Sequence, residues 1–80
     1  MAAPTVGRLH LLTAREFEVL QCLVDGLGPT QLATHLYISP NTSRTHIKTI
    51  RQKLGVHSML EIVSLAVSEG MLPTRTPPPR

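Results

Sequence analysis

The chain has little of the residue types that disulfides, metal centres and aromatic sites require. It contains one cysteine, no tryptophan, one tyrosine and one phenylalanine among 80 residues. Cys22 alone excludes an internal disulfide, and the four histidines are too scattered to complete a zinc site with it. Cys22 lies in an apolar helical pattern, which indicates a small core residue. We therefore expect no metal ion and no cofactor.

Long apolar runs and alternating β-branched runs are also missing. No stretch approaches the roughly 18 apolar residues of a membrane span, and the N-terminus lacks the basic start and apolar stretch of a signal peptide. We therefore expect a cytoplasmic chain with no membrane partner. Its apolar residues are mostly Leu, Val, Ile and Ala, which favours helices. Eighty residues allow one small domain without a sizeable catalytic cavity.

Cap residues divide the sequence into four helical segments. Two segments open on the spacing of a capping box and two on an N-cap residue followed by proline, which suits the first helical turn. In chain order these starts are Thr13 with Glu16, Gly28-Pro29, Ser39-Pro40, and Ser58 with Glu61. Glycines at 26, 55 and 70 supply stops. The pattern predicts an all-α, four-helix domain with helices at about 13–25, 29–36, 40–54 and 58–69.

Helical spacing predicts the buried face of the first segment. Phe17, Leu20, Val24 and Leu27 recur about one turn apart, and Leu12 stands where it can pack onto Phe17 as a hydrophobic staple. We therefore expect these side chains in the core.

The two ends of the chain show no such period. Residues 1–11 contain Pro and Gly and are interpreted as a linker or a remnant of cloning. Residues 73–80 are proline-rich and are expected to be disordered. One domain therefore remains, at residues 12–72.

Positive charge is concentrated in the third segment, which carries four basic residues and no acidic one. Projection as a helix places a wholly polar face within about 120° of arc. That face holds Asn41, Arg44, Thr45, Lys48, Arg51 and Gln52. The opposite stripe holds Ser43, Ile47, Ile50 and Leu54. A helix bound on one side that presents cations on the other is typical of a nucleic-acid reader.

The short second segment, a tight turn and this longer basic segment together predict a helix-turn-helix whose second helix enters the DNA major groove. Arg44 and Lys48 can donate to guanine, and Thr45 can offer its methyl or hydroxyl group to a base edge. We expect these three residues to contact bases. We expect backbone phosphate contacts from Ser39, Asn41, Thr42, Arg51, Gln52 and Lys53.

Several motifs recur together in residues 12–72: LTAREFEVL at 12–20, ISPNT at 38–42, and KLG at 53–55. The set resembles the LuxR/FixJ-type, or NarL-type, DNA-binding domain of bacterial transcription regulators. The resemblance implies an output domain that binds double-stranded DNA sequence-specifically, at the nucleoid when bound. It implies a full-length protein with a receiver or ligand-sensing domain, no small-molecule ligand in this domain, and RNA polymerase as a further candidate partner. It also implies a weak homodimer through the fourth helix, with contacts at Leu60, Ser64 and Val67.

The sequence departs from the family pattern at positions that affect DNA affinity. Ser43 stands on the packed side where valine is usual, and we expect its hydroxyl to bond to a backbone carbonyl one turn back, the alternative being a small void. Gly28 replaces a serine or threonine cap. Thr30 replaces a frequent lysine, which removes one phosphate contact.

The same features also have explanations that involve no DNA binding. A basic helix face is often only solvated surface, and the apolar strip of the fourth helix could be a loosely covered core edge. A helical protein-interaction module with little DNA binding is the main alternative function. An enzyme is a remote third, because no orienting residue accompanies Ser43 and His46. His35 and His57 are interpreted as plain surface residues.

Overall fold

The computed structural model describes residues 8–74, which form a short 3-10 helix and four α-helices without any strand. The elements are η1 (Arg8–Leu11), α1 (Ala14–Val24), α2 (Pro29–Leu36), α3 (Pro40–Leu54) and α4 (Met59–Ser68). The all-α, four-helix prediction is therefore confirmed, with bounds within one residue of those expected. Within the described part of the chain, no helix is both long and apolar enough to span a bilayer.

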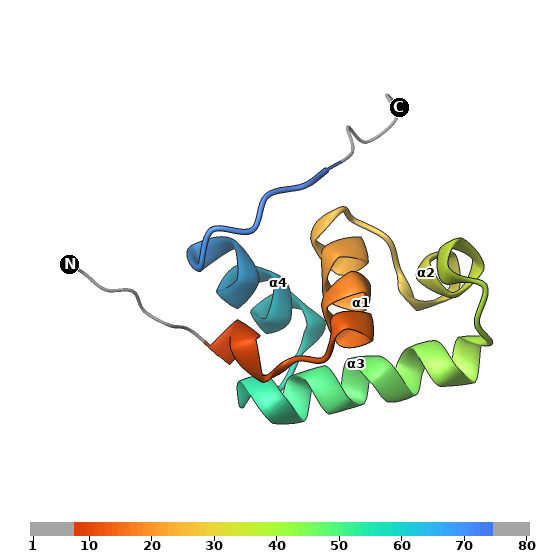
Figure 1. Cartoon of the computed structure of the whole chain (residues 1–80), viewed down its shortest axis with the longest axis horizontal. Helices are drawn as coiled ribbons and strands as arrows, with labels where there is room; N and C mark the ends of the chain where they lie inside the picture. The colour runs from red at the N-terminus through yellow and green to blue at the C-terminus, as the bar shows by residue number, and fades with distance from the viewer. Residues whose placement is uncertain (1–7, 75–80) are drawn as a thin grey trace.

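The longest helix, α3, runs along one edge of the molecule, and the other elements all lie on the same side of it (Figure 1). α1 stands in the middle, between α2 and α4, and its residues contact all three other helices. One core cluster fills the space that these helices enclose. Its largest fully buried side chains are Leu20, Leu32, Ile50, Leu54 and Ile62. This arrangement leaves the outer side of α3 uncovered.

The helix starts form largely as the cap residues predict. The Thr13 hydroxyl accepts from the Glu16 amide at 3.1 Å, and the Glu16 carboxylate accepts from the Thr13 amide at 2.9 Å, which completes a capping box. α4 differs from the prediction. Ser58 caps the Glu61 amide as expected, but the Glu61 carboxylate accepts from the amide of His57, at 2.6 Å, rather than from that of Ser58. The Glu61 side chain therefore also fixes the turn that precedes α4.

The prediction that Phe17 lies in the core is wrong, since its side chain is 40% exposed. At the first turn of α1 the buried residue is instead Glu16, which is only 7% exposed and forms hydrogen bonds there. Leu12, expected to pack on Phe17, instead packs against the core cluster itself. The apolar pattern pointed to Phe17 rather than to its neighbour Glu16, because a charged residue is not expected in a buried position. Glu16 is nevertheless buried on the face of α1 that meets α3, where Lys53 pairs with it.

Residues at both margins of the described range form hydrogen bonds with the helical part of the chain. Arg8, in the expected linker, donates from its guanidinium to the Leu54 carbonyl at 2.7 Å, close to the C-terminal end of α3, where a cation is electrostatically favoured. Thr74, in the expected disordered tail, donates from its amide and its hydroxyl to the Asp25 carboxylate, each at 2.7 Å. Residues 1–7 and 75–80 of the predicted linker and tail lie outside the described range, and the domain bounds stay a prediction.

The turn between α2 and α3 spans the three residues 37–39, as expected for a helix-turn-helix. Tyr37 ends α2 in the left-handed region with φ 59, the one non-glycine residue among residues 8–74 with a positive φ. Its side chain is 94% exposed. Ser39 then caps α3 by accepting from the Thr42 amide at 3.0 Å, and Pro40 occupies the first turn.

Candidate nucleic-acid interface

The outer face of α3 is polar and open to solvent. Five side chains of the predicted polar face are exposed: Asn41, Arg44, Thr45, Lys48 and Gln52. The opposite stripe is fully or almost fully buried: Ser43, Ile47, Ile50 and Leu54. The predicted two-sided character of this helix is therefore confirmed, except that Arg51 is partly buried.

Arg44 and Lys48 lie one turn apart on the exposed face, in the first two thirds of α3. Neither side chain forms a hydrogen bond or an ion pair with any residue from 8 to 74. Their charges are therefore not compensated by contacts within this part of the molecule, and their donors are available to an external partner.

Thr45 lies beside Arg44, and its hydroxyl donates to the Asn41 carbonyl at 3.0 Å. This bond uses the only hydrogen of the hydroxyl and leaves its oxygen as an acceptor. In this conformation Thr45 can accept from a base or offer its methyl group, but it cannot donate.

The first turn of α3 gathers the three residues expected to meet phosphates there. The Ser39 hydroxyl accepts from the Thr42 amide and donates to the Thr42 hydroxyl at 2.9 Å, and Asn41 is exposed beside them. The positive end of the helix dipole favours an anion at this position.

Lys53, which we predicted to contact the DNA backbone, is instead turned toward the protein. Its ammonium lies 2.7 Å from a carboxylate oxygen of Glu16 on α1, in a partly buried ion pair. The hydrogen bond from Lys53 is the main cause of a lowered pKa of the Glu16 carboxyl, followed by the Thr13 amide, while burial opposes both. One of the four cations of α3 is thus neutralised by the protein itself, and Lys53 serves to attach α3 to α1.

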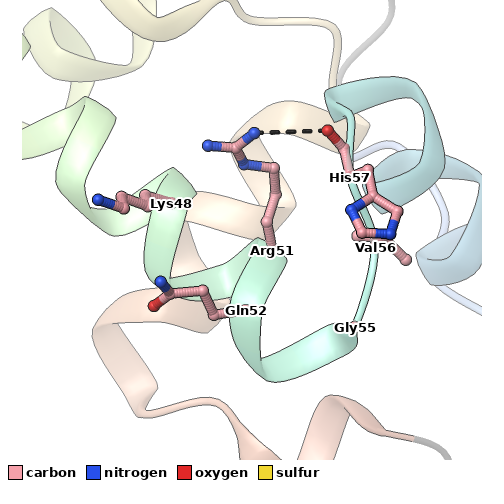
Figure 2. Close-up of a pocket in the computed structure, with 6 residues that line it drawn as sticks. All are labelled: Lys48, Arg51, Gln52, Gly55, Val56 and His57. Carbon is pink, nitrogen blue, oxygen red and sulfur yellow. Dashed lines mark hydrogen bonds between the residues drawn. The ribbon is translucent and has the colours of Figure 1, made fainter.

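Arg51 is also turned back toward the protein. One terminal nitrogen of its guanidinium donates to the His57 carbonyl at 3.4 Å, whereas its Nε is buried and is the one such side-chain atom within residues 8–74 without a hydrogen-bond partner. Figure 2 shows Arg51 reaching across toward the turn after α3, while Lys48 and Gln52 point away from His57. These residues line an open depression of about 420 Å³ together with Gly55 and Val56.

Ser43 forms a hydrogen bond that the sequence predicted only in part. Its fully buried hydroxyl donates to a backbone carbonyl, as expected, but the acceptor is Pro29 at the start of α2, at 2.8 Å, and not a residue one turn back in α3. The bond joins α3 directly to α2. Ser43 therefore fixes α3 to α2, the short helix that precedes it.

The predicted dimer strip is exposed on α4. Leu60 is 76% exposed and Val67 48%, and Ser64 is also exposed, while Ile62 and Ala66 of the same helix are fully buried. One side of α4 thus packs in the core and the other is open to solvent. The dimer contact stays a prediction.

An exposed basic helix, braced by a short preceding helix across a three-residue turn, defines the helix-turn-helix class of DNA-binding domain. A sequence-family model described as bacterial regulatory proteins, luxR family, matches residues 10–66. The chain therefore belongs to the luxR family of bacterial regulatory proteins, and it is a DNA-binding regulatory domain rather than an enzyme.

Individual relatives agree with this assignment. The chain is 37% identical over 67 residues, 84% of its length, to the transcriptional regulatory protein DegU of Brevibacillus brevis. It is 36% identical over 66 residues, 82% of its length, to the transcriptional regulatory protein FixJ of Azorhizobium caulinodans. It is 36% identical over 62 residues, 78% of its length, to the probable transcriptional regulatory protein NarL of Mycobacterium tuberculosis. The matched parts span 28%, 31% and 29% of these three relatives.

Proposed function

We propose that this chain is the output domain of a bacterial transcription regulator and binds double-stranded DNA sequence-specifically, with α3 in the major groove. The observation that carries the proposal is the pair Arg44 and Lys48, exposed on the outer face of α3 and unpaired within the described chain. A helix that is about 10–12 Å wide with its side chains fits a major groove about 12 Å wide. The buried stripe on the other side of α3 gives the helix a fixed orientation.

Base reading is assigned to Arg44, Thr45 and Lys48. Arg44 and Lys48 donate to guanine O6 and N7, the groove atoms that cationic donors recognise best. Thr45 contributes an acceptor or a methyl contact, because its hydroxyl hydrogen is engaged by Asn41. Specificity therefore depends mainly on the two cations.

Backbone positioning is assigned to both ends of α3. Ser39, Asn41 and Thr42 hold one strand at the positive end of the helix dipole, and Arg51 with Gln52 meets the backbone further along. Lys53 is left out of this set, because its pair with Glu16 already satisfies its charge.

Dimerisation is assigned to Leu60, Ser64 and Val67 of α4. The strip is small, so the isolated domain dimerises weakly and pairs mainly on DNA, where two half-sites about 10 bp apart match two copies. The regulator acts in the cytoplasm at the nucleoid, with RNA polymerase as a candidate partner. Leu60→Ala should abolish cooperative binding to paired half-sites in a mobility-shift assay, while binding to one half-site is retained.

Selection of bound duplexes from a random pool tests the proposal. We expect a motif of two short elements spaced by about one helical turn. Affinity for that motif should fall steeply with salt, since each neutralised phosphate contributes about −0.9 to the slope of log affinity against log salt. Failure to enrich any sequence, together with salt-insensitive binding of a protein partner, would instead support a protein-interaction module.

A further inference from the structure

The carbonyl at the end of α3 needs a donor from outside the helix. The last four carbonyls of an α-helix have no partner within it. In α3, Gly55 adopts φ 71, and the amides of Gly55 and Val56 return to the carbonyls of Gln52 and Arg51. This closure of the last turn does not reach the carbonyl of Leu54, the final residue of the helix.

Arg8 supplies that donor. A terminal nitrogen of its guanidinium donates to the Leu54 carbonyl at 2.7 Å, a short distance typical of a charge-assisted hydrogen bond, in a partly buried position. The same nitrogen lies 3.6 Å from the place that a Cβ atom on Gly55 would occupy. A cation is also favoured by the negative end of the helix dipole. Arg8 therefore caps α3 from outside.

The backbone of Arg8 is itself held in place. Arg8 begins η1, which lies over the C-terminal end of α3 (Figure 1). Its amide donates to the Glu69 carboxylate at the end of α4, at 3.4 Å. Leu9 packs against the core cluster, and its carbonyl accepts from the Leu12 amide at 3.1 Å. The guanidinium of Arg8 is therefore presented to α3 by an anchored segment.

Arg8 acts on the backbone of α3, whereas the nearby Lys53 acts through a flexible side chain. Loss of the pair between Lys53 and Glu16 leaves the backbone bonds of the last turn in place. Loss of Arg8 leaves a partly buried carbonyl without its donor, and such a carbonyl is satisfied again when the turn opens to water. Arg51 and Gln52, assigned above to the DNA backbone, belong to this turn. The geometry of that contact therefore depends on Arg8.

We propose that Arg8 is a positioning residue for DNA binding. It keeps the last turn of α3 closed, so that Arg51 and Gln52 are preorganised for the DNA backbone, and it does not contact DNA itself. The proposal rests on the proposed function, and it gives Arg8, interpreted from the sequence as part of a linker, a role in binding. Arg8 precedes residues 10–66, which match the family model, so the family pattern does not predict this contact.

The salt dependence of affinity separates a positioning residue from a direct contact. Each cation that neutralises a phosphate contributes about 0.9 to the slope of log affinity against log salt. Loss of a positioning residue instead lowers the fraction of free protein that has a closed turn and leaves the contacts of the complex unchanged. Arg8→Met should therefore weaken binding by about threefold to tenfold at every salt concentration, with an unchanged slope.

Anisotropy of a fluorescent duplex that carries the selected motif measures both quantities, between about 50 and 200 mM salt. Arg8→Lys should weaken binding less than Arg8→Met, because an ammonium can still donate to the Leu54 carbonyl. Lys53→Met is the matched control, since it removes a cation from the same end of α3 but should leave affinity and slope at the wild-type values. Circular dichroism verifies that each variant is folded at the assay temperature. Arg8→Gln, which retains a neutral donor, replaces Arg8→Met if that variant does not fold.

Amide hydrogen exchange, followed by NMR without DNA, tests the closed turn directly. The Gly55 and Val56 amides should exchange about threefold to tenfold faster in Arg8→Met than in wild type, relative to amides in the buried part of α1. Arg15→Met serves as the comparison, because it removes a similar bond, from a guanidinium to the Leu36 carbonyl at the end of α2, at 3.1 Å. It should leave the exchange of both amides unchanged.

Three results would overturn the role of Arg8. If Arg8→Met is folded and binds like wild type, Arg8 is only structural. If its slope falls by about 0.9, Arg8 meets a phosphate itself. If the Gly55 and Val56 amides are unaffected, the turn does not depend on Arg8. If wild-type protein binds no duplex while these amides respond to Arg8→Met, the proposed function fails, and the role of Arg8 in binding fails with it, although its hold on α3 stands.

Discussion

The four cations of α3 form two pairs that make different contacts. Arg44 and Lys48, the first pair along the helix, are exposed and unpaired within the described chain. Arg51 and Lys53, the second pair, contact the His57 carbonyl and the Glu16 carboxylate. A formal charge on a helix is thus no measure of the charge that a ligand encounters. The first pair is open to a partner, and the second pair attaches α3 to the rest of the protein.

The largest effect should come from removing the unpaired cations. Arg44→Ala combined with Lys48→Ala should lower discrimination between the selected site and a scrambled duplex by at least roughly thirtyfold, since each good base contact contributes about 1–3 kcal/mol. Competition binding measures this ratio. Thermal unfolding should remain near that of wild type, because both side chains are exposed. Discrimination that survives the double change would refute the assignment of base contacts.

Removing a cation that is already paired should instead lower stability and leave DNA binding unchanged. Lys53→Met also removes one cation, but we expect the discrimination between duplexes and the salt dependence of DNA affinity to be unchanged. The free energy of unfolding should fall by about 1–2 kcal/mol, because the Glu16 carboxylate loses its partner in a partly screened environment. Urea denaturation followed by circular dichroism measures the loss. A lower salt slope would show that Lys53 leaves Glu16 to meet DNA.

The same ion pair predicts a pH dependence of stability. The pKa of Glu16 is lowered in the folded protein, chiefly by the hydrogen bond from Lys53. The ionised Glu16 carboxylate therefore stabilises the fold fully at pH values above its unfolded-state pKa of about 4.3. This stabilisation is lost as the pH falls through the lower pKa of the folded state. Urea denaturation between about pH 6 and pH 3 should show this decline. Glu16→Gln should flatten it, and Glu18→Gln, on the exposed side of α1, should not.

A smaller effect should come from the bond that joins α3 to α2. Ser43→Ala removes the donor to the Pro29 carbonyl and should lower the free energy of unfolding by about 1 kcal/mol. If this bond also orients the N-terminal part of α3, discrimination between the selected site and a scrambled duplex should fall modestly. The slope of log affinity against log salt should be unchanged. Ser43→Thr retains the hydroxyl and serves as the control. An unchanged unfolding free energy in Ser43→Ala would remove Ser43 from the helix contact.

Local chemistry made most of the fold predictable. The caps at Thr13, Ser39 and Ser58 act within a few residues of themselves, so the helix bounds could be inferred without tertiary information. The exposed face of α3 could be inferred for the same reason, because helical geometry alone separates Arg44 and Lys48 from the buried stripe. The family motifs then supported the same helix pair.

Contacts between distant segments were not predictable. Lys53 meets Glu16 across 37 residues, and Ser43 meets Pro29 across 14, and no periodic pattern encodes either pair. In each case a polar side chain found its partner through packing that the sequence pattern does not specify.

The turn of the helix-turn-helix carries a useful optical property. Tyr37 is the only tyrosine of a chain without tryptophan, so tyrosine emission reports on this one position, two residues before the N-cap of α3. Its ring is almost fully open to solvent and contributes nothing to the core. A duplex bound at α3 as proposed above would change the surroundings of this ring, so that intrinsic fluorescence can follow complex formation without an attached dye.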